Sequence, residues 1–507
     1  MSVGIPDIPS RLRALLDADQ AVEAFLQIRS LLTQSTDLAP HILGFYGEAV
    51  WRGIAHSVSN CDWTHYDLLV RALPSAMALD PDFWMVGETT LTLAGVSRQQ
   101  LLELNRRYCR RFSAHGAAFE HAPPSGPIRI GILGRDFYSQ ATAYLFTGVA
   151  EHMDRSRFHL TAYDFADNAP DSEWRRRCLD AYDRFASIAG LDDHQAAARI
   201  HADGIDVLVH MRDVPNGRLG ICALRPAPVQ IQYLYFPGTS GAGFMDWLIA
   251  DEVVVPPGHE DGFAEPILRL PGCYQPNDDR RKEPSSLDRQ HCGLPSNAIV
   301  IANFSENHKF TPDMFSLWCD LLIADGRRIL WLLDQTPGIV ANLKREAVLR
   351  GVAPDRLVFS PRMTTADHLA RLRCADLVVD TFPYGGHTLT SDALWAGAAL
   401  VTLQGETFAS RVPASLLAQC GVPELATTSA GDYFALADRL LRDPAMLVEK
   451  RRTIAQARAR SSLFSAGDYA EKFGCAIEDA VQRRWGDGSS SRARWAGSKR
   501  SFAEAGR

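Results

Sequence analysis

Short runs of aliphatic and β-branched residues alternate with longer segments of helical periodicity over most of the chain beyond residue 127. The first set of runs is typical of buried strands, with helices between them. These runs are Ile128–Leu133, Phe158–Tyr163, Ile205–Val209, Val229–Phe236 and Trp247–Ala250. Strands that alternate with helices predict a doubly wound parallel sheet, so the fold class is α/β.

A second set of strand-like runs follows the polar, turn-rich segment Cys273–Pro284, which we interpret as a linker. The runs are Ala298–Asn303, Arg328–Leu333, Leu357–Phe359, Leu377–Val379 and Leu400–Thr402. We therefore expect two Rossmann-like units. Two such units joined by a linker form a cleft, which is the usual place for a ligand.

The first part of the chain has helical periodicity and no convincing fixed-length repeat. Helices are predicted at Arg11–Leu32, Ile42–His56, Trp63–Leu73 and Ser97–Phe112. They form either a plain packing domain or a docking surface for a protein substrate. The Pro-rich joint His121–Pro127 ends this region.

These patterns predict four parts in the chain. Residues 1–122 form an all-helical domain, and 126–280 the first Rossmann-like domain. Residues 285–485 form the second Rossmann-like domain. The Ser-, Gly- and Arg-rich residues 486–507 are predicted to be a disordered tail.

The overall composition argues against several classes of function. At 507 residues, with 46% hydrophobic residues, the chain is long enough for more than one core. Its net charge of -7 argues against general nucleic-acid binding. No apolar run approaches the roughly 18 residues that span a bilayer, and the N-terminus does not resemble a secretion signal. The ten cysteines lack CxxC pairs, so we expect a reduced, cytoplasmic setting and no metal site.

The segment Ala375–Gly397 combines a strand, a glycine turn and the start of a helix. The first amides of such a helix lack partners and point outward, which makes an anion site. His387 and Thr388 add side-chain donors there, and Asp392 lies one turn inside. The plain alternative is an ordinary β-α turn. A second polar strand-to-helix turn, at Leu400–Val412, favours the anion site because both turns face one edge of a sheet.

Several long motifs occur in an order that resembles the catalytic region of protein O-GlcNAc transferase and its SPINDLY-like relatives. The resemblance spans about residues 126–480, and Cys61–Asp67 is similar to the segment that precedes that region in the family. The motifs are Leu224–Gln230, Tyr235–Asp246, Asn303–Lys309, Gly385–Thr388 and Gly405–Arg411. The resemblance implies a GT-B architecture, with two Rossmann-like domains facing a cleft, and metal-independent, inverting transfer of a sugar to protein side chains.

The resemblance also implies which residues act. Lys309 corresponds to the diphosphate-binding lysine of the family and His387 to a residue at the sugar and phosphate, so both are expected to be catalytic. The residues assigned to the nucleotide-sugar are Pro237, Gly238, Thr239, Glu306, Lys309, His368, Arg371, Gly386, His387, Thr388 and Asp392. No cofactor is implied; a UDP-sugar is the co-substrate and a protein is the acceptor.

The chemistry of the reaction explains these residue types. Negative charge grows on the leaving diphosphate, and without a metal it needs fixed donors. Lys309, Thr388 and the helix start would supply them, so we expect Lys309 and Thr388 to open onto one crevice. Asp392 would bind ribose hydroxyls, and His368 with Arg371 would select uracil. Alternatively, Lys309 is a solvated lysine and the His368–Arg371 pair an exposed helix face.

The chain departs from the family pattern mainly at the sugar and acceptor end. Gln140 stands where the family has a histidine, and Arg212–Asn216 replaces a second histidine motif. Tyr235 replaces a glycine, Glu306 a glutamine and Thr365 a lysine. We infer that the donor sugar and the acceptor can differ from those of the family.

Loss of the histidines does not abolish transfer, because another group can deprotonate a hydroxyl acceptor. The region of Asp136, Gln140 and Asp213 is the candidate acceptor and base region, although an aspartate in a loop is more often a cap.

Three hypotheses follow. The leading one is a cytoplasmic glycosyltransferase that moves GlcNAc or a related sugar from a UDP-sugar to Ser or Thr, or to Asn, of a protein. The second is a scaffold that binds nucleotide without turnover, which Tyr235 and the missing histidines favour. The third is a nucleotide-sugar epimerase, against which the Pro237–Gly241 and Gly385–Thr388 motifs speak.

Overall fold

The computed structural model describes residues 47–79, 82–112 and 119–486. The predicted helix Arg11–Leu32 and the predicted tail after residue 486 lie outside these ranges. The described chain groups into two compact units. One contains the residues up to Tyr108 together with Lys282–Arg458, and the other contains Cys109–Arg281 and the residues from Ala459 onward.

The unit that begins at Cys109 is built on a seven-stranded, all-parallel sheet in the order β3-β2-β1-β4-β5-β6-β7. Its strands are β1 (Ile128–Gly134), β2 (Phe158–Asp164), β3 (Arg184–Ser187), β4 (Val207–His210), β5 (Val229–Gln232), β6 (Trp247–Ala250) and β7 (Ile267–Arg269). The strand order reverses between β1 and β4, which is where doubly wound sheets bind ligands.

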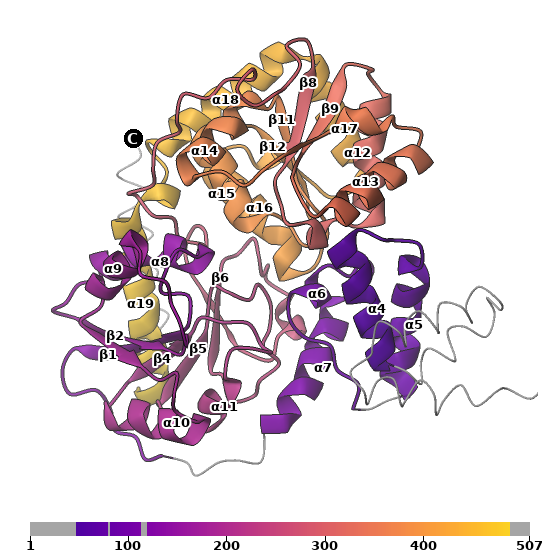
Figure 1. The fold of residues 1–507 in the computed structure, drawn as a ribbon. Helices are drawn as coiled ribbons and strands as arrows, with labels where there is room; N and C mark the ends of the chain where they lie inside the picture. Colours follow the sequence, from indigo (N-terminus) through magenta and orange to yellow (C-terminus); the bar gives the residue numbers. More distant parts are fainter. Residues whose placement is uncertain (1–46, 80–81, 113–118, 487–507) are drawn as a thin grey trace, which may run out of the picture. The chain divides into compact units, whose positions relative to one another are not determined.

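Helices cover both faces of this sheet (Figure 1). They are α8 (Ala141–His152), α9 (Glu173–Asp180), α10 (Asp193–Ala202), α11 (Leu219–Ala223) and α19 (Ala466–Trp485). The C-terminal helix α19 packs on α8, β5 and β7, so the end of the chain completes the core of this unit. There the Tyr233 and Tyr469 hydroxyls lie 2.5 Å apart.

The other unit holds a six-stranded, all-parallel sheet in the order β10-β9-β8-β11-β12-β13. Its strands are β8 (Ile299–Asn303), β9 (Arg328–Leu333), β10 (Leu357–Ser360), β11 (Leu377–Val379), β12 (Leu400–Leu403) and β13 (Ala426–Thr427). The sequence analysis predicted the first five of these, and the order reverses between β8 and β11.

Two groups of helices sandwich this sheet, with α12, α13 and α17 on one side and α14, α15, α16 and α18 on the other (Figure 1). Their bounds are α12 (Pro312–Ile323), α13 (Pro337–Leu349), α14 (Thr365–Cys374), α15 (His387–Ala396), α16 (Phe408–Gln419), α17 (Ala430–Arg442) and α18 (Pro444–Arg458). Gly397 ends α15 in the left-handed conformation, at φ 76°.

A helical segment belongs to the same unit. It contains α4 (Gly47–Asn60), α5 (Tyr66–Leu79), α6 (Glu88–Leu91) and α7 (Arg98–Cys109). Asn342 of α13 donates to the Asn60 carbonyl at 2.9 Å, and Arg345 reaches Asp62 at 3.2 Å. The segment is thus bonded directly to the second sheet's helices.

The sequence pattern missed three strands and overextended one. Strands β3, β7 and β13 are short edge or near-edge strands, with too few residues to show alternation. The predicted strand Val229–Phe236 ends at Gln232, because the chain turns at Leu234, which has a φ of 69°.

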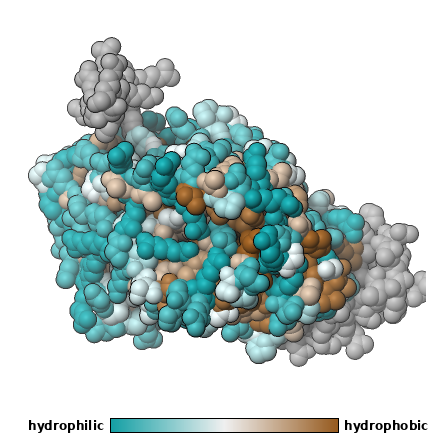
Figure 2. All heavy atoms as spheres, turned by 90° about the horizontal axis from the view of Figure 1, so that it is seen from above, coloured by the Kyte–Doolittle hydropathy of each residue, from teal (hydrophilic) through white to brown (hydrophobic). Residues whose placement is uncertain are grey.

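The surface in the view of Figure 2 is largely hydrophilic, with a smaller apolar area toward one side. Among the described residues, Ile323, Val348 and Leu349, at the C-terminal ends of α12 and α13, are exposed large apolar side chains. No helix within the described ranges is both long and apolar enough to cross a membrane.

Asn303 ties the two strands at the reversal of the second sheet. Its side chain is fully buried, Nδ2 donates to the Val379 carbonyl at 2.7 Å, and Oδ1 accepts from the Ser305 amide at 2.8 Å. Asn303→Ala leaves both partners unpaired, so we expect the free energy of unfolding to fall by about 2–3 kcal/mol. Urea unfolding measures this, with the exposed Glu449→Ala on α18 as control. Equal stability of the two variants would contradict the assignment.

Candidate active site

Two loops meet at the reversal point of the second sheet. The loop after β8 carries residues 304–309, and the loop after β11 carries residues 380–386 before α15 begins at His387. Because β8 and β11 are neighbouring parallel strands, their carboxyl ends open at the same edge. This edge collects most of the residues that the sequence analysis assigned to the diphosphate.

Lys309 reaches from the first loop to the second. Its Nζ donates to the Gly385 carbonyl at 3.1 Å and lies 3.5 Å from the ring centre of Tyr384. Burial lowers the pKa of Lys309 to about 8, against the opposing influence of Glu88, Asp380 and Glu306. The ammonium is therefore a partly desolvated cation held against the turn that precedes Thr388.

A buried carboxylate fixes that turn. Asp380 is fully buried and accepts hydrogen bonds from the Thr381 amide, the Gly386 amide and the Thr402 hydroxyl at 2.8, 2.7 and 2.6 Å. A Cβ on Gly385 would lie 2.6 Å from Pro413, and one on Gly386 would lie 3.0 Å from Asp380. Both positions require glycine because the backbone of the turn packs too closely against Pro413 and Asp380 to leave room for a side chain.

His387 is the first residue of α15, and Gly386 is its N-cap. Its Nε2 lies 2.9 Å from the Ala409 carbonyl, so this nitrogen carries the proton and donates. Burial, and then the charge of Lys309, lower the pKa of His387 to about 3. The imidazole is neutral at ordinary pH, and no side chain caps the helix, so its first amides face the edge that Lys309 occupies.

Further along the same edge, Arg371 and His368 of α14 pack against Phe304. Arg371 Cζ lies 3.9 Å from the Phe304 ring centre, and its Nε donates to His368 Nδ1 at 3.0 Å. His368 Nε2 lies 3.4 Å from the Asp392 carboxylate of α15. Arg371 is only 3% exposed, so little of its side chain is open to a ligand.

Glu306 lies on the first loop and points to the exposed Arg362, whose Nη2 is 2.5 Å from its carboxylate. One residue earlier, the buried Ser305 hydroxyl has no hydrogen-bond partner. The second sheet thus brings together Glu306, Lys309, His368, Arg371, Gly386, His387, Thr388 and Asp392 within one compact unit.

The remaining predicted residues lie in the other unit, where a charged cluster marks the reversal of the first sheet. Arg212, after β4, donates from Nη1 to Asp136, after β1, at 2.7 Å, and its Nε lies 3.1 Å from Asp213. The Arg212 guanidinium also lies 4.2 Å from the ring centre of Tyr235. Burial raises the pKa of Asp136, although Arg212 opposes this shift.

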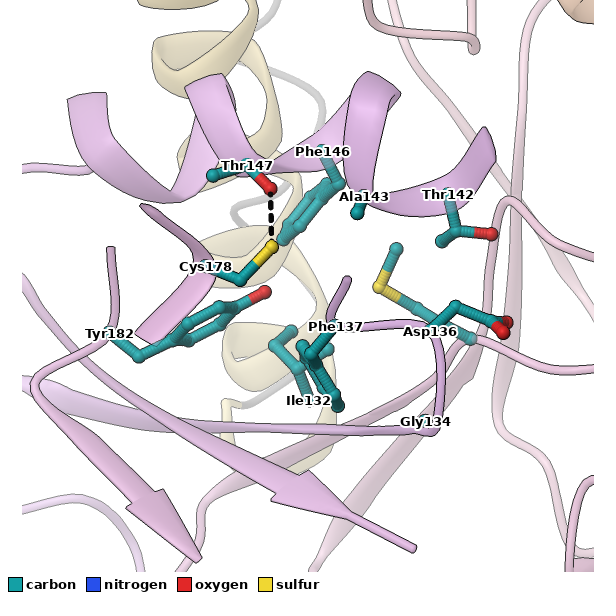
Figure 3. A pocket seen from close by; sticks show the side chains of 11 residues that line it. Ile132, Gly134, Asp136, Phe137, Thr142, Ala143, Phe146, Thr147, Cys178 and Tyr182 are labelled. Atoms are coloured by element: carbon teal, nitrogen blue, oxygen red, sulfur yellow. Dashed lines mark hydrogen bonds between the residues drawn. The ribbon is translucent and has the colours of Figure 1, made fainter. Parts of the chain in front are cut away.

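Asp136 also borders a small, mostly apolar pocket between β1, α8 and α9 (Figure 3). Figure 3 shows Tyr182, Cys178 and Thr147 at one end and Asp136 with Thr142 at the other. The Thr147 hydroxyl and the Cys178 thiol lie 3.3 Å apart. The predicted residue Gln140, the N-cap of α8, is exposed and near Tyr138.

The buried carboxylate of Glu265 supports the loop that contains the motif residues Pro237, Gly238 and Thr239. The Thr239 hydroxyl donates to Glu265 at 2.6 Å, and the Ser240 amide donates to the same carboxylate at 2.7 Å. Thr239 is only 3% exposed. Its hydroxyl therefore holds the loop, and Gly238 is the more exposed part of this motif.

Sequence reasoning missed Asp380, Tyr384, Arg212 and Glu265 as parts of these arrangements. The role of Asp380 could have been predicted from the sequence, because an aspartate that directly follows a buried strand and precedes two glycines can accept hydrogen bonds from the turn between them. The role of Glu265 could not, since it lies in a loop remote from the motif that it supports. Among the described residues, no group of three or more His, Cys, Asp and Glu side chains is placed to hold a metal ion.

The two all-parallel sheets, each with the reversed strand order, define a fold of the GT-B class. The profile of glycosyl transferase family 41 matches residues 109–282 and 278–473. The chain belongs to this family.

Individual relatives agree with this placement. Over 341 residues the chain is 30% identical to the probable UDP-N-acetylglucosamine–peptide N-acetylglucosaminyltransferase SEC of Arabidopsis thaliana, covering 63% of this chain and 35% of that protein. Over 472 residues it is 25% identical to the corresponding transferase of Caenorhabditis elegans, covering 71% and 41%. The chain thus spans less than half the length of these two curated relatives.

A solved structure supports the fold. A mutant of the Thermobaculum terrenum O-GlcNAc transferase superposes with a TM-score of 0.72 at 24% identity, covering 94% of this chain and 98% of that one. The GT-B prediction is confirmed by this likeness and by the two sheets.

The surroundings of Lys309 predict how its amine reacts. Acetic anhydride modifies only the unprotonated amine, so labelling of Lys309 should be half-maximal near pH 8, its lowered pKa. The comparison residue is Lys450, whose pKa is raised by its hydrogen bond to Glu424, so it should label only at higher pH. Peptide mass spectrometry from about pH 6 to 11 follows the titration of Lys309 and compares it with the labelling of Lys450. Coincident profiles would show that the Lys309 environment is not desolvated.

Proposed function

We propose that the chain is an inverting, metal-independent glycosyltransferase that moves N-acetylglucosamine from UDP-N-acetylglucosamine to a Ser or Thr hydroxyl of a protein. Membership of family 41 supports the reaction class, and the activities for which the relatives are named support the donor and the acceptor class. The arrangement of Lys309 against the Gly385–His387 turn is the observation on which the mechanism rests.

In this mechanism the leaving UDP is stabilised by groups that are already in place. Lys309 supplies a positive charge, and the first amides of α15, with the Thr388 hydroxyl, supply donors to the same diphosphate. Their positions are fixed before the donor binds, because Asp380 and the two glycines hold the turn. No reorganisation is then needed as charge grows on the β-phosphate.

His387 acts in this scheme as a neutral group. Its low pKa keeps it uncharged, and its Nε2 proton is engaged with the Ala409 carbonyl. It therefore packs beside the sugar and phosphate and orients them, rather than protonating the leaving group. His368, fixed by Arg371, would present its ring to the base, and Asp392 would bind the ribose.

Asp136 is the proposed base for the acceptor hydroxyl. It would take the part of the family's histidine, at whose position this chain has Gln140. Asp136 lies at the reversal of the first sheet, where an acceptor group can reach a loop, and its raised pKa suits proton uptake. Arg212 holds its carboxylate in one orientation. A small, mostly apolar pocket borders Asp136.

A second candidate is nucleotide binding without transfer. The contact of Arg212 with Tyr235 favours it, because a stacked guanidinium and ring stand in a motif where the family places glycine. The two candidates share the diphosphate site and differ only in turnover.

Substitution of Lys309 separates the candidates. With purified chain, UDP-N-acetylglucosamine and co-expressed proteins as acceptors, we expect released UDP and added sugar mass. Lys309→Ala should lower kcat/KM by about 100- to 1,000-fold, since it removes one fixed donor to the leaving group. A panel of other UDP- and GDP-sugars tests donor choice. Nucleotide binding with no turnover in the unmodified chain would support the second candidate instead.

Substitution of the proposed base should change kcat without changing the affinity for UDP. Asp136→Asn should lower kcat by about 100-fold or more while leaving the Kd for UDP unchanged, because the acceptor alone loses its proton carrier. Asp213→Asn is the matched comparison within the same cluster. If Asp213→Asn instead gave the larger loss, the base would be Asp213.

A further inference from the structure

The end of α4 is joined by two asparagine side chains to two other parts of its own compact unit. The last carbonyls of a helix have no partner within the helix. Asn307 Nδ2 donates to the Ser59 carbonyl at 2.6 Å, and Asn342 Nδ2 donates to the Asn60 carbonyl at 2.9 Å. Asn342 lies on α13, whereas Asn307 begins the short 3₁₀ helix that ends at Lys309. One of the two bonds therefore reaches the segment that carries the lysine.

The residue after α4 adds a second contact to the same short helix. Cys61 is fully buried, and its thiol donates to the Asn307 carbonyl at 3.7 Å. Burial raises the pKa of Cys61 to about 12, so the thiol keeps its proton and remains a donor. Cys61 has a φ of 50°, in the left-handed region that the ends of helices usually give to glycine. A glycine at this position would lack the thiol contact.

These contacts fix the short helix at its first residue. Asn307 is only 8% exposed, and its carbonyl also accepts from the Phe310 amide at 3.0 Å, which closes the turn that contains Lys309. At the other side, Lys309 Nζ donates to the Gly385 carbonyl at 3.1 Å. Helix α4 packs directly against the short helix. The position of the Lys309 backbone beside the turn before α15 therefore depends on the end of α4.

We propose that Asn307 is a positioning residue of the diphosphate site: by joining the end of α4 to the short helix, it keeps Lys309 against the turn before α15. The helical segment then contributes to the donor site through its main chain, besides any part that it has in docking a protein. This inference rests on the proposed function, because it assumes that Lys309 binds the diphosphate of the donor.

The two asparagines provide a matched pair of variants. Asn307→Ala and Asn342→Ala each free one carbonyl at the end of α4, and only the first also frees the short helix of Lys309. We expect Asn307→Ala to weaken UDP binding by about 5- to 30-fold, because the charged donor to the diphosphate loses its fixed position. Asn342→Ala should leave the Kd for UDP within about twofold, since Asn342 anchors α13 and not this loop. Calorimetry with the full chain at about pH 7, below the Lys309 pKa of about 8, measures both.

A second measurement separates positioning from a general loss of stability. In Asn307→Ala the amine of Lys309 is released toward solvent, so its half-maximal labelling by acetic anhydride should move upward from near pH 8. In Asn342→Ala the midpoint should stay near pH 8. Urea unfolding reports the stability of both variants. Asn307→Ser, whose side chain is too short to reach the Ser59 carbonyl, should give the same pattern and takes the place of Asn307→Ala if that variant does not fold.

Two results would overturn the inference. UDP affinity and Lys309 labelling in the folded Asn307 variant that match the unmodified chain would show that the end of α4 does not position the lysine. An equal loss of affinity in the Asn307 and Asn342 variants would show an effect of stability alone. Failure of the proposed function is a separate outcome: it would appear as UDP affinity that does not change in Lys309→Ala.

Discussion

The candidate site depends on one buried carboxylate. Asp380 directly follows a central strand and is fully buried. Hydrogen bonds from its own turn and from Thr402, together with the charge of Lys309, offset the cost of burying it. Those bonds force the chain to double back at Gly385 and Gly386, directly before the start of α15. The geometry that Lys309 meets is therefore a consequence of satisfying Asp380.

Opposite charges meet at this turn. Asp380 accepts from the Gly386 amide, and Lys309 Nζ donates to the Gly385 carbonyl. Around the lysine the imidazoles of His308 and His387 are kept neutral by burial and by the lysine itself. Lys309 is thus a cation held directly against this turn, and a cation placed there favours a ligand of concentrated negative charge.

Much of this could be predicted from the sequence because the signals are local. Strands such as Arg328–Leu333 and Leu377–Val379 are continuous apolar runs, and the glycine stop of α15 is a single-residue signal. Partners that arrive from remote segments could not be predicted. Glu265 beneath Thr239, and Ser59 against Asn307, are joined by tertiary packing alone, and no spacing along the chain indicates them.

At the reversal of the first sheet, the residues that depart from the family pattern contact one another. Where the family places small or imidazole side chains, this chain has Arg212 between two aspartates and against Tyr235. A guanidinium that serves three partners at once is rigid, and it keeps Asp136 in one orientation at the mouth of a pocket. A histidine could move a proton alone, whereas in this cluster the carboxylate would take the proton and the arginine would fix its direction. At the reversal of the second sheet the departures are the single substitutions Glu306 and Thr365, and there Lys309 contacts the Gly385 carbonyl.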